Sequence, residues 1–380
     1  MAPSVSEVPP AAAADRTSGQ HEPLFDLITP YEQFPQEITG PTVWEPKDFV
    51  DHPEKWIHRW SAAELAEIDV AARAFDASGQ PLTAVTAARF PLPTVGALLR
   101  AVRATVTTGR GFVLFKGFPV ARWGARLAAI AYLGLGAHIG HAVSQNSRGH
   151  ILGHVQDLGE DAGALDRVRI YRTRARQFFH CDDSDVVGLL CMARAAAGGE
   201  SDVASAHRVF NVLQRTRPDV VRTLVAPDWH VDRKGECSRG QKGYMRCAIF
   251  YYYDGRLYTK WDPYFVRSLQ RFSDAGEIPP LSAAQLDALQ VLEDTCLQEA
   301  LHMVLEVGDI QFVTNNYMFH ARTEYTDFAP PAPRRHLMRL WLSTPESEGG
   351  WKLPFHDSKE KKRGGIQVDD TPEVAPIEAE

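Results

Sequence analysis

The sequence lacks the features that define several large classes of protein. Five cysteines occur among 380 residues, an odd number at wide spacings without a CxxC pair, which argues against a disulfide framework and against a cysteine-rich zinc site. No stretch reaches the roughly 18–20 consecutive apolar residues that a membrane span needs. No repeat with a period of about 20–50 residues is visible, so neither a solenoid nor a propeller is expected.

The sequence is also short of positive charge. Its 41 Lys and Arg residues are outnumbered by 48 Asp and Glu residues, and the net charge of −7 argues against binding to nucleic-acid phosphates. The composition is otherwise that of a globular protein, with 44% hydrophobic and 23% charged residues. The first residues have no basic start followed by an apolar core, so a secretory signal is not expected. We expect a cytoplasmic protein with a small-molecule partner and neither a nucleic-acid nor a membrane partner; its oligomeric state stays open.

Composition divides the chain into three parts. Residues 1–22 are rich in Ala, Ser and Pro and are expected to form a disordered arm. Residues 23–350 are expected to form a single domain. Residues 351–380 are charged, with a basic run followed by two glycines and an acidic end, and this tail is expected to pack loosely or to lie along the surface.

Helical and strand patterns are interleaved between these ends. Ser61-Ala-Ala-Glu64 and Ser282-Ala-Ala-Gln285 are capping boxes, so a helix is predicted after each, the second running through Cys296 and as far as Met303. Apolar periodicity predicts two further helices, and apolar runs with the turn pair Asp254-Gly255 predict strands. These helices span 94–108 and 122–135, and the strands span 111–116, 186–192, 247–253, 256–261, 308–314 and 335–342. Helices first and strands later favour a mainly β fold, a barrel or sandwich core with flanking helices.

The pattern His180-Cys181-Asp182 is the sharpest chemical feature of the sequence. Side chains at positions i and i+2 of a strand point to the same face, so both ligating groups can reach one metal ion. Such a pair, joined by a distant second histidine, forms the 2-His-1-carboxylate triad of non-heme Fe(II) oxygenases, which leaves coordination positions open for a co-substrate and O₂.

Context separates this pattern from two others of the same form. Chance alone gives about two H-x-D/E patterns in a chain of this composition, so the pattern by itself is weak. The patterns that begin at His52 and His230 lie in a polar, Pro-containing segment and before a turn, and we interpret them as surface or turn residues. His180 instead follows two phenylalanines and precedes the apolar run 186–192, where a core strand would hold ligands rigidly.

Residues near the C-terminal end of the predicted core complete the candidate site. His320 follows the strand predicted at 308–314 and is either the second histidine ligand or a packed core residue. Arg335, Leu337 and Arg339 occupy every second position of the last predicted strand, so their side chains share one face. An arginine that points into a barrel needs an anionic partner, because a buried unpaired charge is unstable, and a dicarboxylate co-substrate would supply one. A solvated charged edge is the other interpretation of these arginines.

Together these segments resemble the taurine dioxygenase/TfdA-like family of Fe(II)- and 2-oxoglutarate-dependent oxygenases (clavaminate-synthase-like). The resemblance runs from about residue 111 to 342. It rests on the order of several motifs, Phe179-His-Cys-Asp182, Gly198-Gly-Glu-Ser-Asp-Val-Ala-Ser205, Gly308-Asp-Ile-Gln-Phe312, His320-Ala-Arg-Thr323 and Arg334-Arg-His-Leu-Met-Arg-Leu-Trp-Leu342.

The resemblance implies a fold and a set of roles. The fold is a double-stranded β-helix, or jelly roll, with Fe(II) bound at one mouth by His180, Asp182 and His320. Arg335 matches the arginine that binds the distal carboxylate of 2-oxoglutarate, and Ser201 matches a hydroxyl position on the same co-substrate. Arg339 matches a position that meets the acidic group of the substrate in some relatives.

Three further polar residues are candidates for binding the substrate: Asp183, Asp185 and Asn146. The two aspartates follow the metal-binding motif where sulfonate-cleaving relatives are mostly apolar, so taurine is not the expected substrate. A carboxylate on one side of the pocket and Arg339 on the other would suit a zwitterion, which points to a small amino acid or an amine-bearing carboxylate. Alternatively, the two aspartates cap a loop or pair with Arg176 at the surface.

Two functions from different classes are compatible with the sequence. The first is an oxygenase that uses Fe(II), 2-oxoglutarate and O₂ to oxidise an unactivated C–H bond, by hydroxylation, desaturation or ring closure, with release of succinate and CO₂. The second is a jelly-roll binding protein that has lost catalysis. Loss of a triad member would be its signature, and none of the three is missing.

Overall fold

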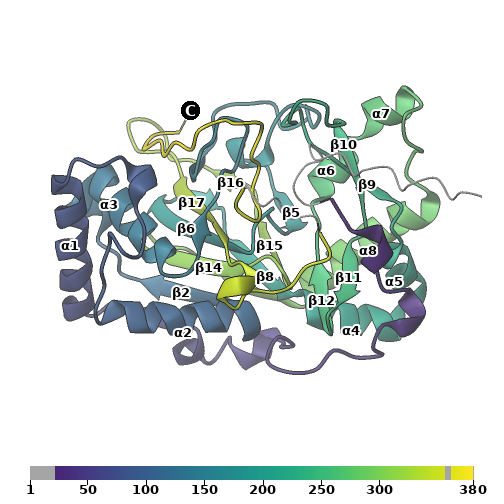
Figure 1. Cartoon of the computed structure of the whole chain (residues 1–380), viewed down its shortest axis with the longest axis horizontal. Helices are drawn as coiled ribbons and strands as arrows, with labels where there is room; N and C mark the ends of the chain where they lie inside the picture. Colours follow the sequence, from purple (N-terminus) through teal and green to yellow (C-terminus); the bar gives the residue numbers. More distant parts are fainter. Residues whose placement is uncertain (1–21, 356–360, 380) are drawn as a thin grey trace, which may run out of the picture.

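Two β-sheets form the core of the computed structural model, which describes residues 22–355 and 361–379 (Figure 1). The predicted disordered arm, apart from its last residue, lies outside the described residues. The larger sheet has the order β1-β2-β14-β6-β17-β3, with β4 paired to β17. Its strands are β1 (Ile57–Arg59), β2 (Phe112–Lys116), β3 (His141–Ala142), β4 (Leu152–Val155), β6 (Val186–Ala193), β14 (Ile310–Thr314) and β17 (His336–Ser343). The smaller sheet has the order β13-β8-β15-β5, formed by β5 (Gln177–His180), β8 (Ser201–Ser205), β13 (Ala300–Met303) and β15 (Met318–Arg322).

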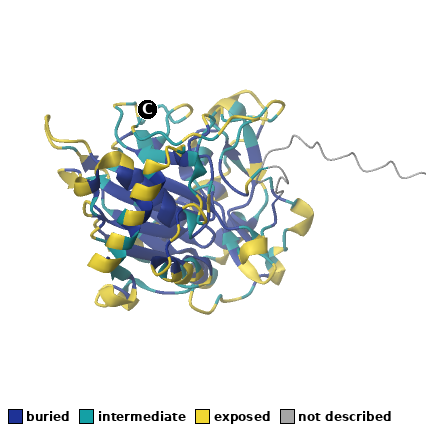
Figure 2. Cartoon of the chain, turned by 60° about the vertical axis from the view of Figure 1, so that its left-hand side comes forward, coloured by how far each residue is buried: buried dark blue, intermediate teal, exposed yellow. Residues whose placement is uncertain are grey.

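Helices cover the outer faces of both sheets. The helices α2 (Val95–Thr108) and α3 (Val120–Ala137) pack on the larger sheet, α1 (Ala62–Ala77) packs against these two helices, and the apolar residues of all three form one core cluster with the sheet. The helices α4 (Ala206–Thr216) and α8 (Ala283–Gln298) pack on the smaller sheet, with α5 (Pro218–Val225) against them, around a second cluster. A third cluster lies between the sheets. Figure 2 shows the buried sheet beneath helices whose outer faces are exposed.

Strand β6 explains why the sequence has a continuous apolar run at this point. Its side chains alternate between two apolar environments, with Val186 and Leu190 facing the helices and Val187 and Cys191 facing the space between the sheets. A strand buried on both faces has no solvent-facing side chains, so the hydrophobic pattern does not alternate. Strand β6 pairs in antiparallel fashion with β14 on one side and with β17 on the other.

Most of the predicted elements are found close to their expected bounds. Both capping boxes are formed, with the Ser61 and Ser282 side chains accepting hydrogen bonds from the backbone three residues on. Asp254 and Gly255 have positive φ angles and join β11 (Phe250–Tyr253) to β12 (Arg256–Thr259) in the expected hairpin. The expected extension of the last helix to Met303 is wrong, because the helix ends at Gln298 and the following residues form β13.

The charged tail is tied to the body of the protein. Arg363 is buried and forms an ion pair with Asp185, with Nη2 2.5 Å from Oδ1 and Nε 3.1 Å from Oδ2. Further along, Ile366 and Val374 form β-bridges with the segment 145–150. The described part of the tail therefore follows a fixed path, contrary to the expectation of loose packing.

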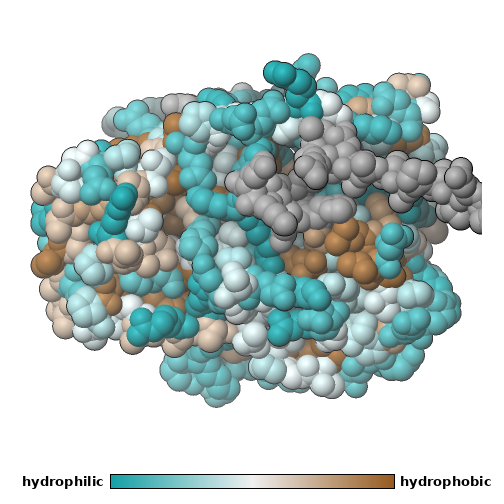
Figure 3. Space-filling model, viewed as in Figure 1, coloured by the Kyte–Doolittle hydropathy of each residue, from teal (hydrophilic) through white to brown (hydrophobic). Residues whose placement is uncertain are grey.

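Among the described helices, none is both long and apolar enough to cross a bilayer. Figure 3 shows a mainly hydrophilic face with separate hydrophobic patches. One exposed apolar residue is Val70 on α1, whose side chain is 69% exposed, while Ile68 two positions earlier is fully buried. Two residues span about 200° of a helix, so these side chains point in nearly opposite directions.

Candidate active site

Three predicted ligands meet between strands of the smaller sheet. His180 ends β5, Asp182 follows two residues later, and His320 stands on β15 directly opposite His180 in the antiparallel register. One ligand atom from each lies within 4.8 Å of the other two, with Asp182 Oδ1 3.9 Å from His180 Nε2 and Oδ2 3.7 Å from His320 Nε2. The pairing of two neighbouring strands therefore builds the predicted triad.

Each of the two histidines turns an imidazole nitrogen, Nε2, towards this point. His180 Nδ1–H donates to the Phe178 carbonyl at 2.9 Å, which leaves Nε2 as the acceptor, and the Gln177 amide lies 2.9 Å from it. Burial, reinforced by repulsion from His180, lowers the pKa of His320 to about 3, and its Nε2 faces Asp182. Neutral imidazole is the form that binds metals.

The carboxylate of the triad is held ionised and in position. Burial by itself raises the pKa of Asp182, but the charge of Arg339 and the nearby histidines outweigh burial and lower it overall. Arg339 Nη1 lies 3.4 Å from Asp182 Oδ1, and the Asp182 backbone N–H donates to Asn315 Oδ1 at 2.9 Å. Asp182 Oδ2 is buried without a hydrogen-bond partner among the described residues. A metal ion at this point would satisfy it.

A small cavity connects the triad to two buried arginines, Arg322 and Arg335. Arg335 precedes β17, is 4% exposed, and donates through Nη2 to the Gly199 carbonyl at 3.0 Å. Its Nη1 has no hydrogen-bond partner among the described residues, and burial lowers its pKa. Ser201 lines the same cavity, with its hydroxyl donating to Gln311 Oε1 at 3.2 Å. The cavity thus has a metal-binding end and a cationic end.

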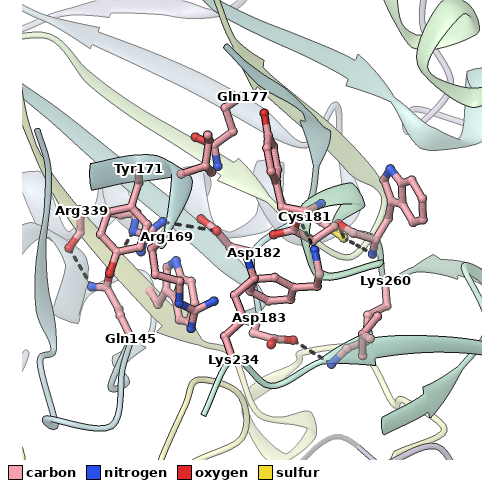
Figure 4. A pocket seen from close by; sticks show the side chains of 17 residues that line it. Gln145, Arg169, Tyr171, Gln177, Cys181, Asp182, Asp183, Lys234, Lys260 and Arg339 are labelled. Atoms are coloured by element: carbon pink, nitrogen blue, oxygen red, sulfur yellow. Dashed lines mark hydrogen bonds and ion pairs between the residues drawn. The ribbon is translucent and has the colours of Figure 1, made fainter. Parts of the chain in front are cut away.

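A second space, the inner pocket, lies on the other side of Asp182 (Figure 4). Arg339 borders both spaces; its Nε donates to Gln145 Oε1 at 2.8 Å, and its guanidinium lies over the Tyr171 ring. Asp183 lines the opposite side and forms an ion pair with Lys260 at 2.7 Å. The pocket is therefore lined by charges of both signs.

Comparison with known proteins agrees with this geometry. Residues 78–341, more than half of the chain, match the family described as "Taurine catabolism dioxygenase TauD, TfdA family". The chain belongs to the TauD/TfdA family. Membership makes the protein an oxidoreductase of the dioxygenase class, and the two-sheet core is the jelly roll of that family.

Two named relatives match the chain over most of its length. FR-33289 synthase of Streptomyces rubellomurinus (strain ATCC 31215) is 29% identical over 325 residues, which are 83% of this chain and 92% of that protein. The taurine hydroxylase-like protein SAT17 of Stachybotrys chartarum (strain CBS 109288 / IBT 7711) is 27% identical over 330 residues, 85% of this chain and 84% of that protein.

Solved structures share the fold at lower identity. An asparagine oxygenase in complex with Fe(II), (2S,3S)-3-hydroxyasparagine and succinate has a TM-score of 0.58 and 16% identity, covering 76% of this chain and 93% of that one. The non-heme iron oxygenase OrfP with Fe, succinate and (3S)-hydroxy-L-Arg has a TM-score of 0.54 and 16% identity, covering 76% and 94%. Both show that the TauD/TfdA fold is present here.

Two of the predicted substrate ligands do not line the inner pocket. Asp185 does not line the inner pocket of this TauD/TfdA-family chain, because Arg363 and the Thr344 backbone N–H occupy its buried oxygens. Asn146 does not line it either; its side-chain oxygen accepts from backbone N–H groups within its own turn. The alternative of a surface pair with Arg176 is also wrong, since Arg176 pairs with Glu293.

Gln145, which the sequence offered as a pocket residue together with Asn146, lines the inner pocket and binds Arg339. The structure adds residues that the sequence reasoning missed. Arg322 lines the cavity of the triad, and the signal for it was its place two residues after His320 on one strand face. Asn315 and Lys234 carried no signal, because their neighbours in space are distant in sequence.

The other two H-x-D/E patterns lie away from the triad, as predicted. His52 is exposed and contacts Glu54 at 3.3 Å. Asp232 of the third pattern, however, is buried rather than at the surface. Its carboxylate accepts hydrogen bonds from the Arg271 guanidinium and the Ser268 hydroxyl. It stands on β9 (Trp229–Asp232), which pairs with β10 (Tyr244–Cys247).

Proposed function

We propose that the protein is an Fe(II)- and 2-oxoglutarate-dependent oxygenase that oxidises an unactivated C–H bond of a small carboxylate or amino acid. The products from the co-substrate are succinate and CO₂, and the substrate is hydroxylated, desaturated or cyclised. One observation carries the proposal: the clustered ligand atoms of His180, Asp182 and His320 open into a cavity that ends at Arg335. We also place the protein in the cytoplasm, which its five unpaired cysteines support.

The residues present fit an Fe(II) ion. Two imidazole nitrogens and one carboxylate on one side of a cavity form the donor set that non-heme Fe(II) oxygenases use. The unsatisfied Oδ2 of Asp182 supports a cation at this point. Bound iron would supply activation of O₂, while the chain holds the ligands rigidly on paired strands and keeps bulk water from the buried cavity.

The residues also fit 2-oxoglutarate. A dicarboxylate has one end to place near the metal and one anionic end to neutralise, and Arg335 has a buried N–H group, on Nη1, without a partner. A guanidinium binds a carboxylate through two parallel hydrogen bonds, which also fixes its orientation. The Ser201 hydroxyl in the same cavity would bind the same carboxylate.

Amino-acid chemistry is the proposed substrate class for two reasons. The inner pocket presents the cation Arg339 and the carboxylate of Asp183 on different sides, which suits a zwitterion. The solved oxygenases with this fold are complexes with hydroxylated asparagine and arginine. In the chain, Arg339 would bind the substrate carboxylate and Asp183 its amine.

The proposal is tested by adding Fe(II) and 2-oxoglutarate to the protein without oxygen. A weak visible charge-transfer band is expected, followed on admission of O₂ by succinate release when the right amino acid or small carboxylate is present. A jelly-roll binding protein without catalysis would give neither signal. A screen of free amino acids and small carboxylates by succinate release then identifies the substrate class.

A further inference from the structure

A third space, the outer chamber, adjoins the inner pocket. It is bordered on its far side by residues 365–368 of the C-terminal tail. Five residues line both spaces: Arg169, Asp183, Val231, Lys260 and Phe265. The outer chamber therefore lies between the inner pocket, which reaches the metal ligand Asp182, and the tail.

The tail segment 363–369, here called the strap, is fixed along its length. Arg363 begins it with the buried ion pair to Asp185. Gly365 N–H donates to the Asp183 carbonyl at 2.6 Å, and Asp369 N–H donates to Ser238 Oγ at 2.9 Å. The two anchoring aspartates lie one and three residues after the metal ligand Asp182, so the strap is positioned relative to the metal site.

The two spaces differ in the charge that they offer a ligand. Each charged side chain that lines the outer chamber has an oppositely charged partner, in the pairs Arg169–Glu236, Lys260–Asp183, Arg233–Glu22 and Asp232–Arg271. Lys234 lines only the inner pocket and forms no ion pair with a described residue; its ammonium lies 3.5 Å from the Val168 carbonyl. Asp262 likewise lines only the inner pocket and forms no ion pair with a described residue, so the side-chain charges without an ion-pair partner lie in the inner pocket and not in the outer chamber.

A ligand with a charged distal end would be poorly accommodated in the outer chamber. Its charge would lose part of its water without gaining a free counter-charge, which is unfavourable. The remaining lining includes Val231, Met245, Phe265, Ile366 and Val368. These apolar side chains favour an uncharged group.

We propose, resting on the function proposed above, that the substrate is an elongated acid. Its charged end lies in the inner pocket beside the metal, and an uncharged arm extends into the outer chamber. The strap side chains Ile366 and Val368 bound that arm and so determine which substrates are accepted. An amino acid extended by an acyl or amide group fits this description better than a free amino acid.

The test uses full-length protein loaded anaerobically with Fe(II) and 2-oxoglutarate. The probes are free lysine and glutamate, Nε-hexanoyl-lysine and the side-chain hexylamide of glutamate, which all keep the α-carboxylate and the α-amine, and binding is followed through tryptophan fluorescence, to which Trp261 and Trp341 of the inner pocket contribute. The variant Val368→Phe narrows the outer chamber. The control Val374→Phe changes another valine of the tail that does not line it and is already 42% exposed.

At least one extended probe is expected to bind about tenfold more tightly than its free parent, and Val368→Phe should remove that gain while leaving the Kd of the parent within about twofold. Val374→Phe should change neither value. The proposal is overturned if no extended probe exceeds its parent, or if Val368→Phe keeps the gain or weakens both probes alike. If Val368→Phe does not fold, Val368→Ala replaces it and should shift the preference to a longer, octanoyl arm; an unchanged preference overturns the proposal.

The two proposals fail separately. The charge-transfer band of the same preparation tests the iron and 2-oxoglutarate chemistry before any probe is added. The titration, repeated on protein without metal, measures the arm's contribution even if that band is absent.

Discussion

At the scale of single residues, His320 is the ligand whose role the sequence left most open. Its replacement in His320→Ala should abolish succinate release, because two remaining ligands do not hold Fe(II) in the required geometry. The fold should persist, as judged by circular dichroism. His52→Ala, at an exposed histidine, is the control and should keep full activity. Full succinate formation by the His320 variant would contradict the triad.

Arg335 gives a second test at this scale. Arg335→Lys keeps the charge but loses the planar fork, so the apparent KM for 2-oxoglutarate should rise about tenfold or more. Ser201→Ala should act in the same direction with a smaller effect, about 1 kcal/mol for one hydrogen bond. Arg334→Lys is the matched control, since Arg334 is exposed and binds only the Asp157 carbonyl. An unchanged KM in Arg335→Lys would point to Arg322.

The buried imidazole of His207 should make the stability of the fold depend on pH. It is buried between Thr42 and the Leu257 carbonyl, and burial lowers its pKa to about 4. The unfolded chain takes up a proton near pH 6.5, whereas the folded chain resists it, so stability should fall as the pH drops from about 6.5 to 4. Across this pH range the free energy of unfolding should fall by about 3 kcal/mol through His207. Urea unfolding of the wild type and His207→Gln across this range should show a shallower pH dependence in the variant.

At the scale of elements, Gly188 on β6 allows helix α3 to pack closely on the larger sheet. A Cβ at Gly188 would lie 2.6 Å from the Tyr132 hydroxyl and 2.8 Å from the Phe312 ring, so Gly188→Ala should lower the free energy of unfolding by about 1–3 kcal/mol. Gly96→Ala on α2 is the control, because its Cβ would make only ordinary contacts. That helical substitution should stabilise by about 0.5–1 kcal/mol. Equal effects on denaturant midpoints would contradict this packing argument.

At the scale of the whole molecule, the tail is part of the folded domain. Arg363→Met leaves Asp185 buried without its cation and should lower the free energy of unfolding by about 3–5 kcal/mol. The neighbouring Lys362→Met removes an exposed pair with Glu373 and should change it by less than about 1 kcal/mol. Chemical denaturation of both variants measures the difference. Similar values would mean that the strap is not anchored by this pair.

Much of the architecture could be predicted from local patterns. Capping boxes, the Asp254-Gly255 turn and the apolar run of β6 depend on residues a few positions apart, so their signals are readable in the sequence. The extension of α8 towards Met303 failed because the residues after Gln298 pair with β8, and that partner is almost a hundred positions away. A long-range strand pairing overrode the local helical pattern.

By itself the sequence determined the chemistry: His180 and Asp182 at strand spacing, a later histidine, and the arginines of the last strand. The tertiary structure decided which polar residues face the pocket. Asp183 and Asp185 differ by two positions, yet one lines the pocket and the other is buried against Arg363. The sequence does not reveal this difference, because it depends on where a tail some 180 residues away returns to the core, and burial of a charge is stable only where its partner is present.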